Sequence, residues 1–135
     1  MFLLDTVALS QAMKSRPDRG YLAWFKNVDT NDLHISVITV GEIEHGIERQ
    51  RSAQPEFAHR LGIWCARIIA AHEERMLPVT VEIARAWGRL AHLRGHATAD
   101  LLIAATAIVH DLTVVTRNVR HFDGTGAKIL NPFEG

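Results

Sequence analysis

Short apolar runs alternate with longer segments of helical period along this chain, and this alternation restricts its fold more than any other feature. The runs expected to form strands are residues 2–4, Leu33–Val37, Met76–Val79, Leu112–Val115 and Ala127–Leu130. Each run is short enough to be a buried strand. Strands that alternate with helices predict a three-layer α/β/α fold around a mainly parallel sheet. The length of 135 residues suits a single domain over positions 1–135.

Helices between these runs are predicted from periodicity and capping residues. The expected helices are Ala8–Lys14, Tyr21–Val28, a segment capped by Ser36 or Thr39 that ends near Arg51, Pro55–Glu74, Thr80–Leu93 and Thr98–His110. Proline suits the first turn of the fourth helix, and Gly95 ends the fifth. In the fourth helix the period predicts that Leu61, Trp64, Ile68 and Ile69 face the core.

Composition limits the function and the compartment. Lys and Arg together number 15, as do Asp and Glu, which argues against a polybasic binder but leaves room for a local basic groove. The single cysteine, Cys65, predicts a reducing compartment. The apolar start of the chain stops at Asp5, too early for a signal peptide, and the later stretch Leu61–Ala71 is much shorter than the roughly 20 residues that span a bilayer. We therefore expect a cytoplasmic protein without a membrane segment.

Four polar residues fall where predicted elements begin or end. Asp5 follows the first strand, and Asn118 lies just past the strand Leu112–Val115. Glu42 and Asp100 lie in the first turns of predicted helices. Because ligands of an open parallel sheet gather outside the carboxyl ends of its strands, we expect three carboxylates and one amide to share a cleft.

Each of the four also has an ordinary structural explanation. Asp5 suits a helix N-cap, and Asp100 is an acid favoured by the helix dipole. Glu42 suits a solvated helix face and Asn118 a turn. The functional hypothesis therefore depends on the four residues as a set.

Clustered carboxylates predict a metal site, because they repel one another unless a cation compensates them. Hard oxygen ligands suit Mg²⁺ or Mn²⁺. Such an ion lowers the pKa of a bound water and neutralises charge on a phosphodiester. The sequence offers no competing Ser-His-Asp or Cys-His arrangement, glycine-rich phosphate loop or zinc-ligand spacing.

Four segments resemble motifs of the PIN-domain family, and more narrowly of the VapC-type ribonuclease toxins of bacterial type II toxin–antitoxin pairs. They are Leu3–Thr6 (LLDT), Ile38–Gly46 (ITVGEIEHG), Asp100–Ala107 (DLLIAATA) and Leu112–Phe122 (LTVVTRNVRHF). The segments occur in the family's order and spacing and span nearly the whole chain.

Position by position, the resemblance implies that Asp5, Glu42 and Asp100 are the acidic metal ligands. Thr116 and Asn118 match the polar fourth position of the catalytic set. Many members have Asp where this chain has Asn118, and a neutral amide adds no charge, which leaves one or two metals open. Many members also have Asp where this chain has His121, to which we assign no role.

The resemblance further implies the activity and the partners. It implies an endoribonuclease that cleaves structured RNA, commonly transfer or ribosomal RNA, and inhibits growth when unrestrained. It also implies a homodimer and a cognate antitoxin that covers the active-site groove, in a toxin–antitoxin hetero-oligomer.

Basic residues near the acids are candidates for substrate binding. Arg117 and Arg120 flank Asn118 and are placed to contact RNA phosphates, as are Arg49 and Arg51 at the end of the Glu42 helix; the alternative is an ordinary solvated surface. His45, three residues after Glu42, is either a general acid or base or a surface residue.

Two other functions remain as alternatives. A PIN-like module that binds RNA or an antitoxin without cutting is favoured by the amide of Asn118. A signalling domain in which Asp5 accepts a phosphoryl group is disfavoured, because no second aspartate stands two residues later.

Overall fold

Five parallel strands form the centre of the fold in the computed structural model, which describes residues 1–134. The strands are β1 (Phe2–Leu4), β2 (Leu33–Ser36), β3 (Met76–Leu77), β4 (Thr113–Val115) and β5 (Lys128–Leu130). Their order across the sheet is β3-β2-β1-β4-β5, and every neighbouring pair is parallel. All five carboxyl ends therefore meet at one edge of the sheet, as the sequence predicted.

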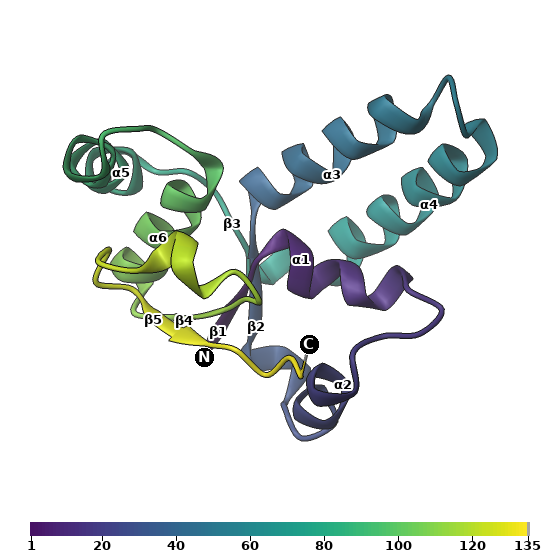
Figure 1. The fold of residues 1–135 in the computed structure, drawn as a ribbon, viewed down its shortest axis with the longest axis horizontal. Coiled ribbons are helices and arrows are strands. Elements are labelled where there is room, and N and C mark those ends of the chain that lie inside the picture. Colours follow the sequence, from purple (N-terminus) through teal and green to yellow (C-terminus); the bar gives the residue numbers. More distant parts are fainter. Residues whose placement is uncertain (135) are drawn as a thin grey trace.

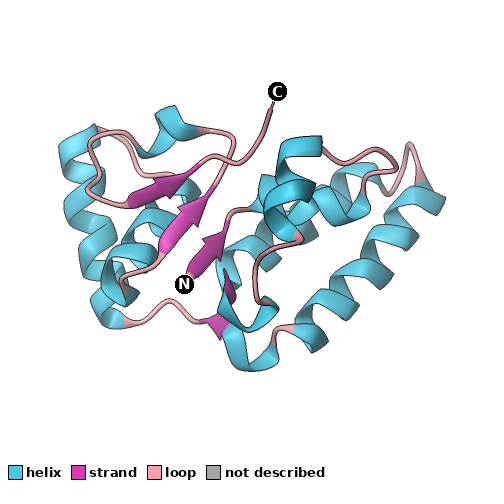
Figure 2. Cartoon of the chain, turned by 90° about the horizontal axis from the view of Figure 1, so that it is seen from below, coloured by secondary structure: helices cyan, strands magenta, loops and turns pink. Residues whose placement is uncertain are grey.

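Helices cover both faces of this sheet (Figures 1 and 2). They are α1 (Thr6–Leu9), α2 (Arg19–Phe25), α3 (Val37–Gln50), α4 (Pro55–Ala71), α5 (Val81–Arg94) and α6 (Ala99–His110), with the 3-10 turns η1 (Ser10–Met13), η2 (Thr30–Asp32), η3 (Glu73–Arg75) and η4 (Val119–Phe122). The helices α5 and α6 pack on one side of the sheet, and α1 to α4 on the other. The predicted three-layer α/β/α fold is confirmed.

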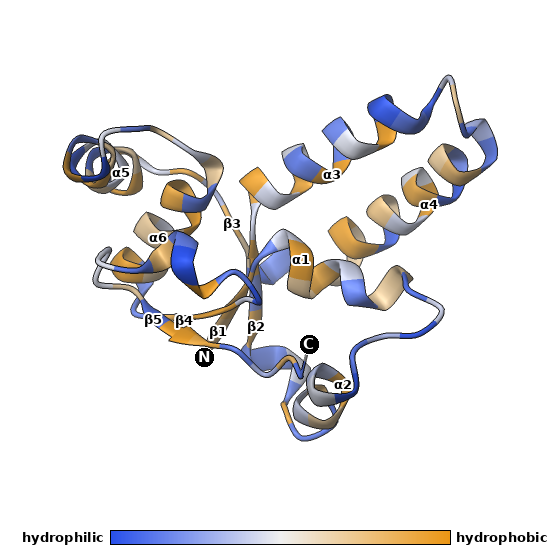
Figure 3. Ribbon diagram, in the orientation of Figure 1, coloured by the Kyte–Doolittle hydropathy of each residue, from blue (hydrophilic) through white to orange (hydrophobic). Residues whose placement is uncertain are grey.

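Neighbouring strand residues supply the two apolar cores. Side chains alternate between the faces of a strand, so Leu3 faces the core under α5 and α6 whereas Leu4 faces the core under α1 to α4. Val114 and Val115 divide in the same way on β4. In Figure 3 the strands β4 and β5 are orange, while α3 alternates between blue and orange turns, as expected for a helix with one solvated face.

Capping residues fix where the long helices begin. The side chains of Ser36, Thr80 and Thr98 accept hydrogen bonds from backbone N–H groups in the first turns of α3, α5 and α6. Gly95 ends α5 in the left-handed conformation, with φ of 79°. The predicted helix end at Gly95 is confirmed, and of the two residues predicted to cap α3, Ser36 and not Thr39 is the cap.

Two predictions about α4 were wrong. Ile69 is 42% exposed, because α4 packs mainly on α3 and buries only a narrow stripe that includes Cys65. The helix ends at Ala71, before the predicted Glu74. The final carbonyl groups of α4 are bonded instead by side chains: Arg75 Nη2 donates to Ala71 O at 3.1 Å. Within the described residues, no helix has the length and apolar character needed to cross a membrane.

Candidate active site

Asp5 lies at the carboxyl edge of the sheet, directly after β1. Leu4 pairs with Val115 of β4, so the next residues of the two strands, Asp5 and Thr116, emerge beside each other. The backbone N–H of Asp5 donates to Val115 O at 3.2 Å, and Asp5 Oδ1 accepts from the N–H of Ala8 at 2.8 Å. Asp5 is thus the N-cap of α1, and only 4% of it is exposed. The structural and functional explanations of this residue are compatible.

The pKa of Asp5 is raised above its ordinary value, in part by the charges of the other two acids. Burial is the largest cause that raises this pKa, and the carboxylates of Asp100 and Glu42 raise it further. Hydrogen bonding from the Thr116 side chain and from the Ala8 N–H acts in the opposite direction. The carboxylates of Glu42 and Asp100 therefore lie close enough to Asp5 to interact with its charge.

Glu42 reaches the sheet edge from the second turn of α3. Thr6 Oγ1 donates to Glu42 Oε1 at 2.6 Å, across 36 positions of sequence. Because Thr6 begins α1 and follows Asp5, this bond joins α3 to the strand end that carries the buried acid. In the sequence Thr6 is distinguished only by its place in the LLDT motif, and its position next to Asp5 is the signal that could have indicated a role.

Asp100 lies in the first turn of α6, behind the Thr98 cap. Its Oδ2 is 2.6 Å from Nδ1 of His121, which belongs to η4. An ionised carboxylate offers only acceptors, so the imidazole proton of this pair belongs on Nδ1. No role was predicted for His121, although it lies three residues past Asn118 in the segment that leaves the carboxyl end of β4.

The oxygen donors suit a hard divalent cation, because three carboxylates share the site and one of them is buried. In the arrangement observed, Glu42 is bonded to Thr6 and Asp100 to His121. No three His, Cys, Asp or Glu side chains among residues 1–134 converge closely enough in this arrangement to hold one ion. The three carboxylates therefore have the right chemistry for Mg²⁺ or Mn²⁺. In the observed conformation Glu42 and Asp100 instead bond neighbouring side chains.

The segment after β4 adds polar and basic groups. Thr116 is fully buried, and its Oγ1 accepts from the backbone N–H of Asn118 at 2.9 Å. A hollow beside this segment is lined by Arg117, Asn118, Val119, Arg120, His121 and Asn131. The predicted pair of arginines thus lines the same hollow as His121, which contacts the acid of α6.

Other predicted candidates lie differently. Arg51 forms an ion pair with Glu48 at 2.8 Å at the outer end of α3 (Figure 1), so it belongs to a solvated helix end. His45 is exposed on the same helix. Cys65 is buried, as predicted for a packed residue.

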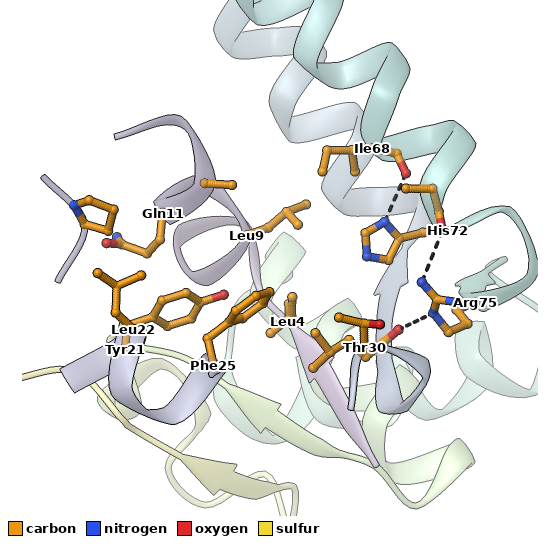
Figure 4. A pocket seen from close by; sticks show the side chains of 14 residues that line it. Leu4, Leu9, Gln11, Tyr21, Leu22, Phe25, Thr30, Ile68, His72 and Arg75 are labelled. Atoms are coloured by element: carbon orange, nitrogen blue, oxygen red, sulfur yellow. Dashed lines mark hydrogen bonds between the residues drawn. The ribbon is translucent and has the colours of Figure 1, made fainter. Parts of the chain in front are cut away.

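An apolar cavity of about 630 Å³ lies beside the site, between η1, α2 and the end of α4 (Figure 4). Leu9, Phe25 and Ile68 are among its lining residues, and His72 and Arg75 stand at one side. Asp5, Glu42 and Asp100 do not line it. The cavity is therefore mainly apolar, and it is separate from the acidic residues at the sheet edge.

Comparison with known proteins identifies the family. The PIN domain profile matches residues 2–128. The chain belongs to the PIN-domain family. The family resemblance seen in the sequence motifs is confirmed, and the acids described above occupy the carboxyl edge of a PIN-domain sheet.

Two curated relatives and one solved structure are similar to this protein over nearly the whole chain. The chain is 33% identical over 141 residues to VapC ribonuclease Y4jK of Sinorhizobium fredii, covering 99% of each chain. It is 55% identical over 127 residues to ribonuclease VapC19 of Mycobacterium tuberculosis, covering 90% of this chain and 92% of the relative. The crystal structure of FitAcB from Neisseria gonorrhoeae contains a chain that superposes with a TM-score of 0.75 at 28% identity, covering 98% of each chain.

Proposed function

We propose that this PIN domain is a metal-dependent endoribonuclease and the toxin of a bacterial toxin–antitoxin pair, acting in the cytoplasm on structured RNA such as transfer or ribosomal RNA. The observation that carries the proposal is the buried Asp5, whose pKa is raised by burial and by the carboxylates of Asp100 and Glu42. A buried carboxylate beside two others is unfavourable unless a cation binds there. The ribonuclease names of two relatives support the same reaction.

Mg²⁺ or Mn²⁺ is the proposed cofactor, and Asp5, Glu42 and Asp100 are the residues that would hold it. When bound, the ion supplies Lewis-acid chemistry: it lowers the pKa of a water and offsets phosphate charge. Asp5 is fixed by its backbone bonds at the end of β1, so it is the rigid member of the set. Glu42 and Asp100 would join it through the carboxylate oxygens that do not bond Thr6 and His121, which are Oε2 of Glu42 and Oδ1 of Asp100.

Neighbouring residues of this chain then bind and orient the RNA. Arg117 and Arg120 line the hollow next to His121, where guanidinium groups attract phosphate oxygens. The amide of Asn118, at the same hollow, offers a donor and an acceptor to the substrate or to a water. Thr116 links Asp5 to the segment after β4, because its hydroxyl group bonds both the Asp5 side chain and the backbone N–H of Asn118.

The test is RNA cleavage by purified protein with Mg²⁺ or Mn²⁺, compared with the same protein in EDTA. Asp5→Asn and Asp100→Asn should each lower cleavage by about 10²–10³-fold or more, with unchanged circular dichroism. Asp111→Asn is the matched control, because Asp111 lies past the opposite end of α6 and Asn tolerates its positive φ of 55°. Equal cleavage by wild type and Asp5→Asn would overturn the proposal.

The cellular role needs its own measurements. The 5′ ends of cellular RNA, mapped after brief induction of wild type and of Asp100→Asn, identify the target and the cleaved bond. We also propose a homodimer that joins an antitoxin in a hetero-oligomer, in line with toxin–antitoxin complexes among the structural neighbours. Light scattering on the chain alone and with its co-expressed antitoxin tests both assemblies.

One observation favours a second candidate function. Asn118 contributes an amide where many family members have an acid, so the site carries one charge fewer. A module that binds RNA or an antitoxin without cutting is the alternative. RNA binding with no turnover in Mg²⁺ or Mn²⁺, together with turnover in Asn118→Asp, would support it.

A further inference from the structure

The segment after β5, residues 131–134, turns back to α2 and lies beside it in Figure 1, where the yellow end of the chain meets the purple helix. The backbone N–H of Glu134 donates to Asp18 Oδ1 at 3.1 Å. Asp18 is also the N-cap of α2 and lies 3.8 Å from Nη2 of Arg117. One carboxylate therefore joins the start of α2, the 131–134 segment and an arginine of the candidate site.

Phe133 makes the main side-chain contact of this segment. Its ring stacks on Tyr21 with centroids 5.2 Å apart and planes at 28°. The guanidinium carbon of Arg117 lies 4.5 Å from the Phe133 ring centroid. Because each partner requires a face of the ring, Phe133 is held between Tyr21 and Arg117.

This stack borders the acidic site. Burial, and secondarily the Asp5 carboxylate, raise the pKa of Tyr21 to about 12, so Tyr21 stays neutral close to the acid. At the other end of the stack, Arg117 lines the hollow that also contains Asn118 and His121. Phe133 therefore connects a residue near Asp5 with the arginine at the edge of the site.

The groups that restrain the guanidinium of Arg117 are the Phe133 ring, 4.5 Å away, and the Asp18 carboxylate, 3.8 Å from Nη2. The Nε of Arg117 is buried and has no hydrogen-bond partner within residues 1–134. Its side chain is 35% exposed, so the guanidinium group keeps access to solvent on the side of the hollow. A guanidinium that stacks on an aromatic ring retains its in-plane N–H groups for a bidentate contact to phosphate.

We propose that Phe133 is a positioning residue, which holds the guanidinium of Arg117 at the edge of the acidic site as a binding group for an RNA phosphate. The proposal rests on the proposed function in taking RNA as the ligand. It assigns a role to a segment outside the four motifs and outside the matched residues 2–128.

The first test measures binding without cleavage. A fluorescein-labelled hairpin RNA is titrated with the protein in EDTA over a series of KCl concentrations, and anisotropy gives the affinity. Arg117→Gln should weaken binding about tenfold and reduce the slope of log affinity against log salt by about 0.7–0.9, the contribution of one phosphate contact. Phe133→Leu should cause a similar loss, and the double variant no further loss. Phe133→Tyr should restore binding, since it restores the ring.

A matched pair elsewhere provides the control. Arg60 lies 5.6 Å from the ring centroid of Phe57 near the start of α4, at the far end of the α3–α4 pair in Figure 1. Arg60→Gln and Phe57→Leu remove the same kind of contact and the same charge. Both should leave the salt slope unchanged, which separates a general charge effect from the positioning of Arg117.

A second measurement does not depend on RNA or on a variant that folds. The Nε–H proton of Arg117 should resonate upfield of those of the other arginines in the NMR spectrum of the wild type, because the Phe133 ring current shields it. An unshifted proton overturns the proposal, as does a double variant whose binding loss is the product of the two single losses. If the Arg117 and Phe133 variants lose RNA binding non-additively but the wild type cleaves no RNA in Mg²⁺ or Mn²⁺, only the proposed enzymatic function is overturned. If the wild type binds no RNA, the proposed function and the role of Phe133 are both overturned.

Discussion

His121 Nδ1 lies 2.6 Å from Asp100 Oδ2, so a ring from the segment after β4 contacts an acid at the start of α6. A distance this short is typical of a hydrogen bond to a charged group. The backbone of His121 is held in turn, because Arg94 donates to carbonyl groups at His121 and Asp123. The orientation of one proposed metal ligand is thereby fixed from α5 and η4.

The first prediction concerns this pair. His121→Leu should lower kcat/KM for RNA cleavage by about 10–100-fold, the usual cost of removing a hydrogen-bond partner of a metal ligand. His121→Asn, which keeps a donor near the position of Nδ1, should lose much less. Metal affinity measured by calorimetry should follow the same order. If all three proteins cleave and bind Mn²⁺ alike, the pair has no functional role.

The second prediction concerns the bond from Thr6 Oγ1 to Glu42 Oε1, 2.6 Å long. Thr6→Val keeps the shape of the side chain and removes the donor, so it should weaken metal binding roughly tenfold. Thr6→Ser keeps the hydroxyl group and should bind metal nearly as the wild type does. The α3 helix stays capped by Ser36 in both variants, so their far-ultraviolet circular dichroism should match. Equal metal affinity in Val and Ser variants would refute the role of this bond.

The third prediction follows from the raised pKa of Asp5. A carboxyl group whose pKa is higher in the folded than in the unfolded state lowers stability as the pH rises from its ordinary value of 3.8 through the raised value. Asp5→Asn removes that loss and keeps an N-cap acceptor, so without divalent metal its Tm at pH 7 should exceed that of the wild type by roughly 3 °C. The difference should disappear as the pH falls below 3.8.

Asp111 is the control for this prediction, because its pKa is lowered whereas that of Asp5 is raised. The Lys128 ammonium group 2.8 Å away lowers the pKa of the exposed Asp111, so Asp111→Asn should not raise the Tm at pH 7. Mg²⁺ or Mn²⁺ should raise the Tm of the wild type and change that of Asp5→Asn little, because a ligand stabilises only the state that binds it. If neither Mg²⁺ nor Mn²⁺ changes the Tm of the wild type, the result argues against the metal site.

The hydrophobic periodicity of the sequence and the predicted ends of its strands and helices were sufficient to predict which residues lie at the carboxyl edge of the sheet. The strand before Asp5 and the helix cap before Asp100 are local features, and each can be predicted from a few consecutive residues. Their meeting in space follows from the rule that parallel strands end together. The place of Glu42 near the start of its helix was also predictable, since both candidate caps, Ser36 and Thr39, put the helix start a few residues before it.

Contacts between distant segments were beyond such reasoning. The bonds of Thr6 to Glu42 and of His121 to Asp100 depend on how far side chains extend between separate elements at the sheet edge, which no local sequence pattern encodes. Phe133 gave no signal, because a single aromatic residue after the last strand has no periodicity. Ile69 was misplaced since a residue adjacent to the buried stripe of a helix differs from it by only about 100°.

The fourth prediction uses the close approach of the 131–134 segment to α2. A Cβ atom at Gly20 would clash with the backbone oxygen of Pro132 and would lie 2.8 Å from Glu134 Cγ. Because the first neighbour is backbone, Gly20→Ala must displace the segment, and we expect a loss of about 1–3 kcal/mol in the free energy of unfolding. Displacement also moves Phe133, so the salt slope of RNA binding should fall as it does in Phe133→Leu.

Gly62→Ala is the matched substitution, since nothing lies within 4 Å of a Cβ atom there and the residue is inside α4. Alanine is favoured over glycine in a helix by about 0.5–1 kcal/mol, so this variant should be more stable than the wild type and bind RNA unchanged. Opposite signs at the two glycines would show that the Gly20 effect comes from the lost close approach and not from helix propensity, which favours alanine at both sites. A Gly20→Ala protein as stable as Gly62→Ala would mean that the segment moves aside without cost.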